Sequence, residues 1–158
     1  MKNFDINFKL LLISNAISNL GVQILRFALI LFLVDLTRSA TVLGVATAIT
    51  QIPLFLLAPV GGSMADRMNK KQLIVMLDAA STVLCLILFV IFWQQAYTVV
   101  NLTIIMTILV GIVTVAGPVF FSAMPLIVKE AHLVEANGAI SSLRAISNLA
   151  GPALGGVF

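Results

Sequence analysis

Long apolar stretches with only brief interruptions make up most of this chain. Five of them are long enough to form a transmembrane helix, which needs about 20 residues. They lie near residues 10–36, 41–64, 72–93, 98–121 and 139–158. The strands of a membrane barrel would alternate apolar and polar residues, and these stretches do not. The pattern therefore predicts an all-α fold, a polytopic transmembrane helical bundle of about five spans.

The breaks between these stretches are short, with one exception. Three of them cover residues 37–40, 65–71 and 93–97. The fourth, residues 125–137, mixes charged and apolar residues and is expected to form a short amphipathic segment along the membrane surface. We interpret its His132 as a solvated loop histidine, with a proton relay as the alternative.

Composition places the chain in a membrane. Of its 158 residues, 61% are hydrophobic and only 9% are charged, whereas soluble domains carry about a quarter charged residues. The net charge of +3 comes from dispersed cations without a basic stripe, which argues against a nucleic-acid partner. The single cysteine, Cys85, excludes a disulfide within the chain and is expected to be a small packing residue. We expect no metal site and no cofactor.

The distribution of cations predicts that the N-terminus lies inside the cell. With that orientation only Arg38 falls outside, while seven cations lie on or near the cytoplasmic face. These seven are Lys2, Lys9, Arg67, Lys70, Lys71, Lys129 and Arg144. The first apolar stretch is too long for the apolar region of a signal peptide, so we interpret it as a retained span. Trp93 and Tyr97 are then expected at the outer interface, which favours amphipathic rings.

Polar residues recur on one side of the first predicted span. Asn15, Ser18, Asn19, Gln23 and Arg26 fall within roughly 140° of arc on a helix. Because polar groups in hydrocarbon are costly, this stripe predicts a water-filled substrate cavity. The predicted cavity residues are Asn15, Asn19, Gln23, Arg26 and, from the second span, Gln51. Arg26, near mid-membrane, would be a counter-charge to substrate or the partner of an acid. For Asp78 in the third span, structural pairing and a proton-linked role both stay open.

Two later spans carry small residues at helical spacing. Ser147, Gly151 and Gly155 stand four apart and predict a close helix contact, with Pro152 bending the same turn. In the fourth span such a face could serve packing or line the cavity. Its members are Thr103, Thr107, Gly111, Thr114 and Pro118.

Two motifs resemble signatures of the major facilitator superfamily. The segment GSMADRMNKK, residues 62–71, resembles the signature between the second and third helices, with Asn69 where a glycine is usual. Asparagine tolerates the same left-handed backbone. Residues 147–156 resemble the fifth-helix signature of the exporters, G-x-x-x-G-P-x-x-G-G, with Ser147 replacing the first glycine. Residues 125–137 and the helix after them are similar to the drug-exporting branch, which includes macrolide-efflux and enterobactin-exporter proteins.

The resemblance implies a secondary active transporter in the plasma membrane that exports small amphiphilic compounds, drug- or macrolide-like, by alternating access. Its expected partners are membrane lipid, a small-molecule substrate and, for a proton antiporter, protons. The residues implied as a conformational latch are Gly62, Asp66, Arg67, Lys70 and Lys71. Those implied as the bend and seal of the fifth helix are Ser147, Gly151, Pro152, Gly155 and Gly156. The fourth span has no charge, and so lacks the arginine of the fourth-helix signature of proton antiporters, which leaves the coupling ion open.

Transporters of this superfamily have two six-helix halves with the substrate site between them. We therefore expect residues 1–158 to be a partial N-terminal bundle, a fragment that needs the missing C-terminal half for transport. The alternative is a non-transporting membrane protein that acts as an interaction or regulatory partner of a full-length transporter. An enzyme is not expected, because the sequence has no metalloprotease motif, nucleophile elbow, phosphate loop or Cys-His constellation.

Overall fold

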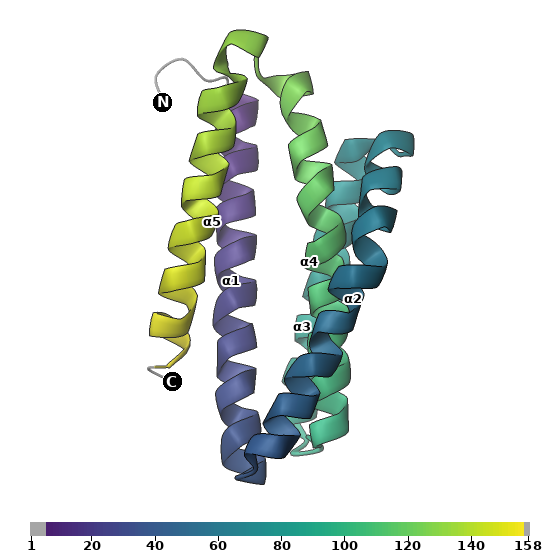
Figure 1. Ribbon diagram of the computed structural model, residues 1–158, viewed down its shortest axis with the longest axis vertical. Coiled ribbons are helices and arrows are strands. Elements are labelled where there is room, and N and C mark those ends of the chain that lie inside the picture. Colours follow the sequence, from purple (N-terminus) through teal and green to yellow (C-terminus); the bar gives the residue numbers. More distant parts are fainter. Residues whose placement is uncertain (1–5, 157–158) are drawn as a thin grey trace. The chain divides into compact units, whose positions relative to one another are not determined.

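The computed structural model describes residues 6–156, and that range is helical apart from short connections (Figure 1). The elements in order are α1 (Ile6–Thr37), α2 (Ala40–Arg67), α3 (Lys70–Trp93), α4 (Val99–Ile127), the 3-10 helix η1 (Glu130–His132) and α5 (Leu133–Gly155). The predicted all-α fold is thus confirmed. Four of the described helices, α1 to α4, are long and apolar enough to cross a membrane. The fifth helix, α5, does not reach that level of hydropathy, so its membrane crossing stays a prediction.

Two of the helix breaks are made by single residues with a left-handed backbone. Arg38 has a φ of 46° and ends α1, while its N–H donates to the carbonyl oxygen of Val34 at 2.8 Å. Ser39 then begins α2 by accepting a hydrogen bond from the N–H of Val42. Gln95, with a φ of 54°, turns the chain between α3 and α4. Such a φ is uncommon for residues other than glycine and allows a sharp reversal in few residues.

The predicted loop at residues 65–71 is wrong in extent, because only Met68 and Asn69 are non-helical there. Asn69 explains why α3 begins so early: its side chain accepts hydrogen bonds from the N–H groups of Lys71 and Gln72. Asn69 has a φ of −65°, so it does not adopt the left-handed backbone that asparagine tolerates. Asn69 is therefore the N-cap of α3.

The separate amphipathic segment predicted at residues 125–137 is wrong for a related reason. Helix α4 extends into the first residues of this segment and α5 includes its last residues. Only Val128, Lys129 and η1 lie between the two helices. Val128 is buried, which fixes this connection against the helices. His132 is half-buried at the end of η1, with Nδ1 3.7 Å from the carboxylate of Glu135.

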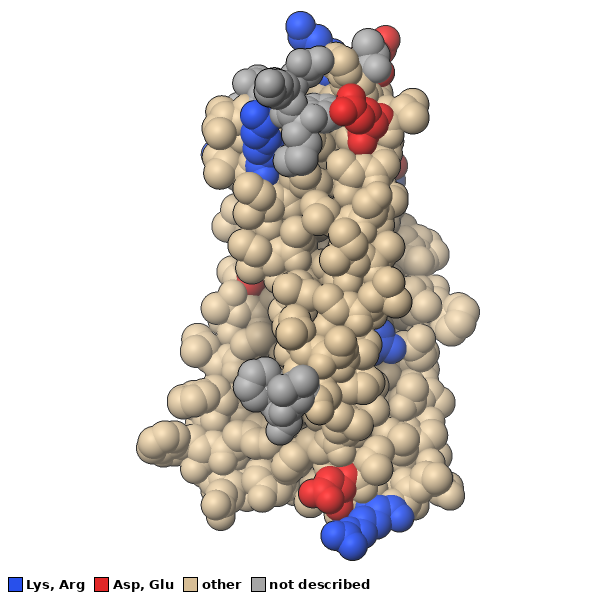
Figure 2. All heavy atoms as spheres, turned by 90° about the vertical axis from the view of Figure 1, so that its left-hand side faces the viewer, with Lys and Arg blue, Asp and Glu red and all other residues tan. Residues whose placement is uncertain are grey.

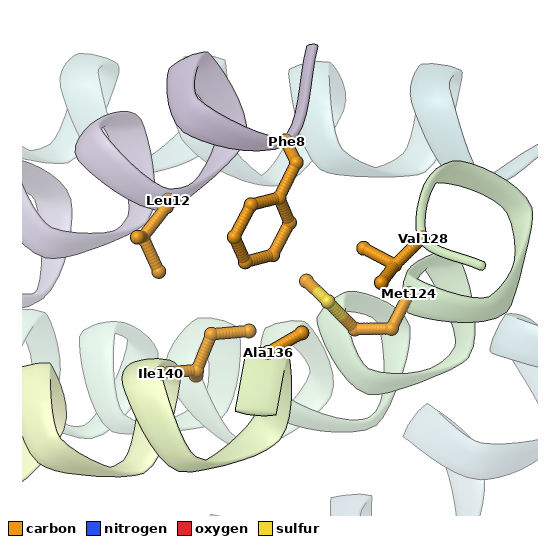
Figure 3. Close-up of a cluster of buried hydrophobic side chains, with 6 residues drawn as sticks. All are labelled: Phe8, Leu12, Met124, Val128, Ala136 and Ile140. Atoms are coloured by element: carbon orange, nitrogen blue, oxygen red, sulfur yellow. The ribbon is translucent and has the colours of Figure 1, made fainter. Parts of the chain in front are cut away.

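The helices divide into two compact units, and each is described by itself. One unit contains residues 6–28 and 121–156, which are most of α1, the end of α4, η1 and α5. The other contains residues 29–120. The first unit has an apolar core in which the Phe8 ring lies near the Met124 side chain (Figure 3). The core residues are Phe8, Leu12, Met124, Val128, Ala136 and Ile140.

The unit of residues 29–120 is held by apolar and aromatic contacts. Ala65, Leu73 and Val119 form one buried cluster that joins α2, α3 and α4. The ring of Phe32 on α1 stands edge-on to two others, 5.0 Å from Phe92 and 5.1 Å from Tyr97 between centroids. Tyr97 is therefore an anchor for the turn between α3 and α4.

The outer surface of the helices is apolar. Phe55 is 77% exposed and Trp93 79% exposed, and the face drawn in Figure 2 consists mostly of uncharged residues. Continuous apolar exposure of this kind marks a surface that contacts lipid or other helices. Cys85 belongs to this surface. Its predicted role as a packing residue is wrong, because the buried residues of α3 are Leu73 and Leu88.

Candidate functional site

Helix α5 lies against α1 along a line of small residues. Ser147, Gly151 and Gly155 are all buried on one face of α5. A Cβ atom on Gly151 would lie 2.5 Å from the Cβ of Gln23, and one on Gly155 would lie 2.9 Å from the carbonyl oxygen of Ile24. Real side chains do not approach so closely, so the two backbones meet only because these positions are glycines. The close helix contact expected from the spacing is confirmed.

The two helices of this seam run in the same direction (Figure 1). Leu12 shares the apolar core with Ile140, and further along α1 Gln23 meets Gly151. Residue numbers therefore rise together on both helices. This register places the middle of α5, around Arg144, level with the polar stripe of α1.

That polar stripe is turned at least partly toward α5. The side-chain amide of Gln23 donates a hydrogen bond to the side-chain oxygen of Asn148 on α5. Asn15 is only 7% exposed, and Asn19 and Arg26 are half-buried. Four of the five predicted cavity residues thus lie along one helix of one unit, where at least one of them is engaged by a polar residue of a second helix.

The remaining predicted residues of the membrane interior belong to the unit of residues 29–120. Gln51 is half-buried on α2 and Asp78 is half-buried on α3. Both take part in polar interactions within the protein.

Arg144 lies further from the start of its helix than the sequence predicted. The fifth span was predicted to start at residue 139, which put Arg144 near the cytoplasmic face. Because α5 begins at Leu133, Arg144 lies midway along the helix. The central carbon of its guanidinium is 4.8 Å from the ring centroid of Phe121. Its Nε atom is buried and has no hydrogen-bond partner among residues 6–156.

Helices α2 and α4 form a second close contact, within the other unit. A Cβ atom on Gly61 of α2 would lie 3.0 Å from the Cα of Val115 on α4. In return, a Cβ on Gly111 of α4 would lie 3.0 Å from the Leu57 side chain on α2. Each helix therefore contributes a glycine at which the other approaches.

The polar face of α4 takes part in this packing at Gly111, and its threonine hydroxyls are satisfied within the helix. Each of three threonine hydroxyls donates at 2.7 Å to a carbonyl oxygen one turn earlier in α4, so none of them needs water. They are Thr103, Thr107 and Thr114. A pocket of about 380 Å³ does lie between the first turns of α2 and α4, but its lining is nearly all apolar. It is lined by Thr41, Val42, Val45, Ala46, Ile49, Val99, Val100, Thr103 and Ile104.

The charged residues of the α2–α3 connection lie at helix ends. Asp66 and Arg67 are exposed in the last turn of α2, after the half-buried Gly62. Lys70 and Lys71 are the first two residues of α3. A helix dipole favours cations at its C-terminus and anions at its N-terminus, so of these four charges only Arg67 stabilises its own helix.

Long apolar helices, an apolar outer surface and close glycine contacts between helices together define a polytopic helical membrane protein. The chain belongs to the family described as transmembrane secretion effector, a family of the major facilitator superfamily, whose model matches residues 4–158.

Similarity to curated proteins agrees with this family. Macrolide efflux protein A of Streptococcus pyogenes is 27% identical over 161 residues, which cover 96% of this chain. The protein of the same name from a serotype M6 strain of that species shows the same identity over the same length. The chain spans 38% of the length of these relatives. No solved structure shows significant similarity to it.

Proposed function

We propose that these helices form the N-terminal part of a secondary active transporter that exports small amphiphilic compounds across the plasma membrane. The observation that carries the proposal is the α1–α5 seam. A proline-containing helix there packs on α1 through glycines, in a chain whose family is that of transmembrane secretion effectors. The curated relatives are named for macrolide efflux, which supports a drug-like substrate.

The seam suits a helix that moves during alternating access. Pro152 has no N–H, so the carbonyl group of Asn148 lacks its helical donor and the helix bends easily at that turn. Gly151 and Gly155 present no side chains that would interlock with α1. Helix α5 can then tilt along α1 without first separating from it, while the seam stays closed to water.

The charges between α2 and α3 suit a latch that opens and closes in the same cycle. Asp66, Lys70 and Lys71 lie at helix ends whose dipoles disfavour them. They are therefore available to oppositely charged groups elsewhere in a complete transporter. The two lysines also favour a cytoplasmic position for this connection, and with it an N-terminus inside the cell.

The polar residues within the membrane would provide the path for substrate and coupling ion. We assign Asn15, Asn19, Gln23, Arg26 and Gln51 to substrate contact, since hydrogen-bonding groups at this depth are otherwise costly. Asp78 is the candidate for a proton-linked role, because it lies well inside a predicted span, whereas Asp35 lies at the end of one. On this assignment, export is coupled to proton entry.

The test is efflux by the full-length protein that contains this chain, in cells without their own drug exporters. Cells that express it should accumulate several-fold less of a labelled macrolide than cells with an empty vector. A protonophore should abolish that difference.

The variants test the site assignment. Arg26→Ala and Asp66→Asn should each restore most of the accumulation. The control is Arg38→Ala, which replaces an exposed cation at a helix break and should leave efflux unchanged. Accumulation equal to that of the empty vector, at verified membrane expression, would refute macrolide export. Full efflux by both variants would refute the site assignment.

A further inference from the structure

The pocket between the first turns of α2 and α4 is lined almost entirely by apolar side chains. Seven of its lining residues are aliphatic and the other two are threonines. The hydroxyl of Thr103 donates to the carbonyl oxygen of Val99 at 2.7 Å, so it needs no partner in the pocket. Thr41 is exposed, at the end of the pocket where α2 begins. Water would find too few hydrogen-bond partners in such a lining, so the pocket suits an apolar occupant.

The dimensions of this pocket fit an extended hydrocarbon chain. Along α2 the lining runs from Thr41 to Ile49, which is about 12 Å at the rise of an α-helix. A volume of about 380 Å³ over that length gives a mean cross-section of about 30 Å². An α-helix with its side chains is about 10–12 Å in diameter and fills more than twice that area. A single hydrocarbon chain parallel to the helices is the occupant that these dimensions admit.

Two opposite charges lie next to the open end of the pocket. Asp35 is in the last turn of α1, and Arg38 directly follows that helix, three residues before Thr41. Both are exposed, and Figure 2 shows an acidic and a basic side chain next to each other at its lower edge, where α1 ends. Neither residue forms an ion pair within residues 6–156. Both charges are therefore available to a ligand that carries an anion and a cation.

Aromatic residues place the same end of the unit at the surface of a membrane. Trp93, the last residue of α3, is 79% exposed. The ring of Phe32, about one turn before Asp35 on α1, contacts that of Tyr97 in the turn between α3 and α4. Tryptophan and tyrosine favour the depth of the lipid headgroups. The charged pair and the mouth of the pocket thus lie where headgroups are found, with the apolar lining extending toward the hydrocarbon.

We propose that this pocket binds one acyl chain of a phospholipid with an ethanolamine headgroup. The phosphate accepts hydrogen bonds from the guanidinium of Arg38, whose planar fork suits two phosphate oxygens. The ammonium group of ethanolamine donates to the carboxylate of Asp35. The site shares no residue with those assigned to substrate, latch or seam. Its loss therefore leaves efflux in place, and the inference does not depend on the export function.

The test is photolabelling of the full-length protein in phosphatidylcholine vesicles that contain a small fraction of a reactive lipid. This lipid is a phosphatidylethanolamine with a diazirine near the middle of one acyl chain, and mass spectrometry of peptides locates the label. A phosphatidylglycerol with the same chains is the matched comparison, because it carries the phosphate without the ammonium group. The wild-type protein should carry the label mainly in residues 41–49 and 99–104, and several-fold more of it from the ethanolamine lipid.

Two exposed valines provide a filled pocket and its control. Val45 lines the pocket and is 55% exposed, whereas Val83 on α3 is 53% exposed and does not line it. Because neither side chain is buried, a tryptophan at either position should leave the fold intact. Val45→Trp should reduce the label in residues 41–49 and 99–104 several-fold, and Val83→Trp should leave it unchanged.

Two further variants test the headgroup contacts. Asp35→Asn should remove the preference for the ethanolamine lipid, because the ammonium group loses its counter-charge. Arg38→Gln should lower the labelling by both lipids, since both carry a phosphate. Equal labelling of the wild-type protein by the two lipids would overturn an ethanolamine lipid as the occupant.

The distribution of the label decides about the pocket itself. Label spread evenly over the exposed faces of α2, α3 and α4 would overturn the proposal, because it would report lipids that surround any membrane protein. Absence of label from residues 41–49 and 99–104 would overturn it as well, and would show that another part of the full-length protein covers the pocket.

Discussion

Gly151 is a position at which a single methyl group is expected to separate two helices. A Cβ there would lie 2.5 Å from the Cβ of Gln23 and 3.2 Å from its carbonyl carbon, so the backbone of one helix must shift. We expect Gly151→Ala to cost about 1–3 kcal/mol, as overpacking of a close contact does. Gly138 on the same helix has nothing within 4 Å, so Gly138→Ala should be neutral or slightly stabilising. Thermal unfolding in detergent measures both, and equal unfolding temperatures would contradict the seam.

Substitutions of Asn69 distinguish two roles for this residue, a helix cap and a position that requires a left-handed backbone. As the N-cap of α3 it accepts hydrogen bonds from Lys71 at 3.1 Å and Gln72 at 3.4 Å. Asn69→Ala should therefore lower the stability by about 1 kcal/mol, Asn69→Ser should retain most of it, and Asn69→Gly should cost only a few tenths. If the position instead required a left-handed backbone, Asn69→Gly would raise the unfolding temperature above that of the wild type. The same unfolding measurement decides between the two.

The contacts of a single residue could be predicted from sequence where spacing along one helix determines them. They could not be predicted where they depend on residues of another helix. The four-residue spacing of Ser147, Gly151 and Gly155 puts them on one face of any α-helix, which is why the seam could be predicted. The position of Arg144 along its helix depends on where that helix begins, and the apolar stretch placed this start at residue 139 instead of Leu133. Its stacking on Phe121 depends on the end of a different helix, and no local pattern reports that.

At the scale of helices, the contact between α2 and α4 should also tolerate little change. A Cβ on Gly61 would lie 3.0 Å from the Cα and 3.3 Å from the carbonyl oxygen of Val115, and backbone atoms cannot rotate away. We expect Gly61→Val to lower stability by at least about 2 kcal/mol through overpacking. Gly44→Val is the matched control, because Gly44 lies on the same helix with nothing within 4 Å. A similar unfolding temperature for the two variants would show that α2 and α4 are not in close contact.

The helix boundaries show what hydropathy can and cannot predict. Apolar length identified α1 to α4, because a helix that crosses lipid must be long and apolar. The predicted breaks were too long because a helix continues as long as its backbone hydrogen bonds are satisfied, whether its side chains are apolar or charged. Thus α2 runs through Asp66 and Arg67, and α5 begins at Leu133, well before the apolar stretch that predicted it. A side-chain cap sets the start of α3, at Asn69.

At the scale of the whole molecule, the chain is organised by which groups can remain in hydrocarbon. Large apolar side chains are exposed along the described helices, while polar residues of α1 and α5 meet each other at Gln23 and Asn148. The charged residues Asp66, Arg67, Lys70 and Lys71 are concentrated where α2 passes into α3. The direction in which this arrangement crosses the membrane follows from the positive-inside rule, and it can be tested without any transport assay.

The two ends of α3 should be accessible from opposite sides of the membrane. Lys71 lies at its first turn and Gln94 directly follows its last residue, and both are exposed. In a background in which Cys85 is replaced by alanine, a membrane-impermeant maleimide added to intact cells should label Gln94→Cys. It should label Lys71→Cys only after the membrane is permeabilised, because a basic connection is retained on the cytoplasmic side. Labelling of Lys71→Cys in intact cells would show that the topology is the inverse of the one proposed. The cytoplasmic latch assigned to Asp66 and Arg67 would then be untenable, whereas the packing of α1 against α5 would stand unchanged.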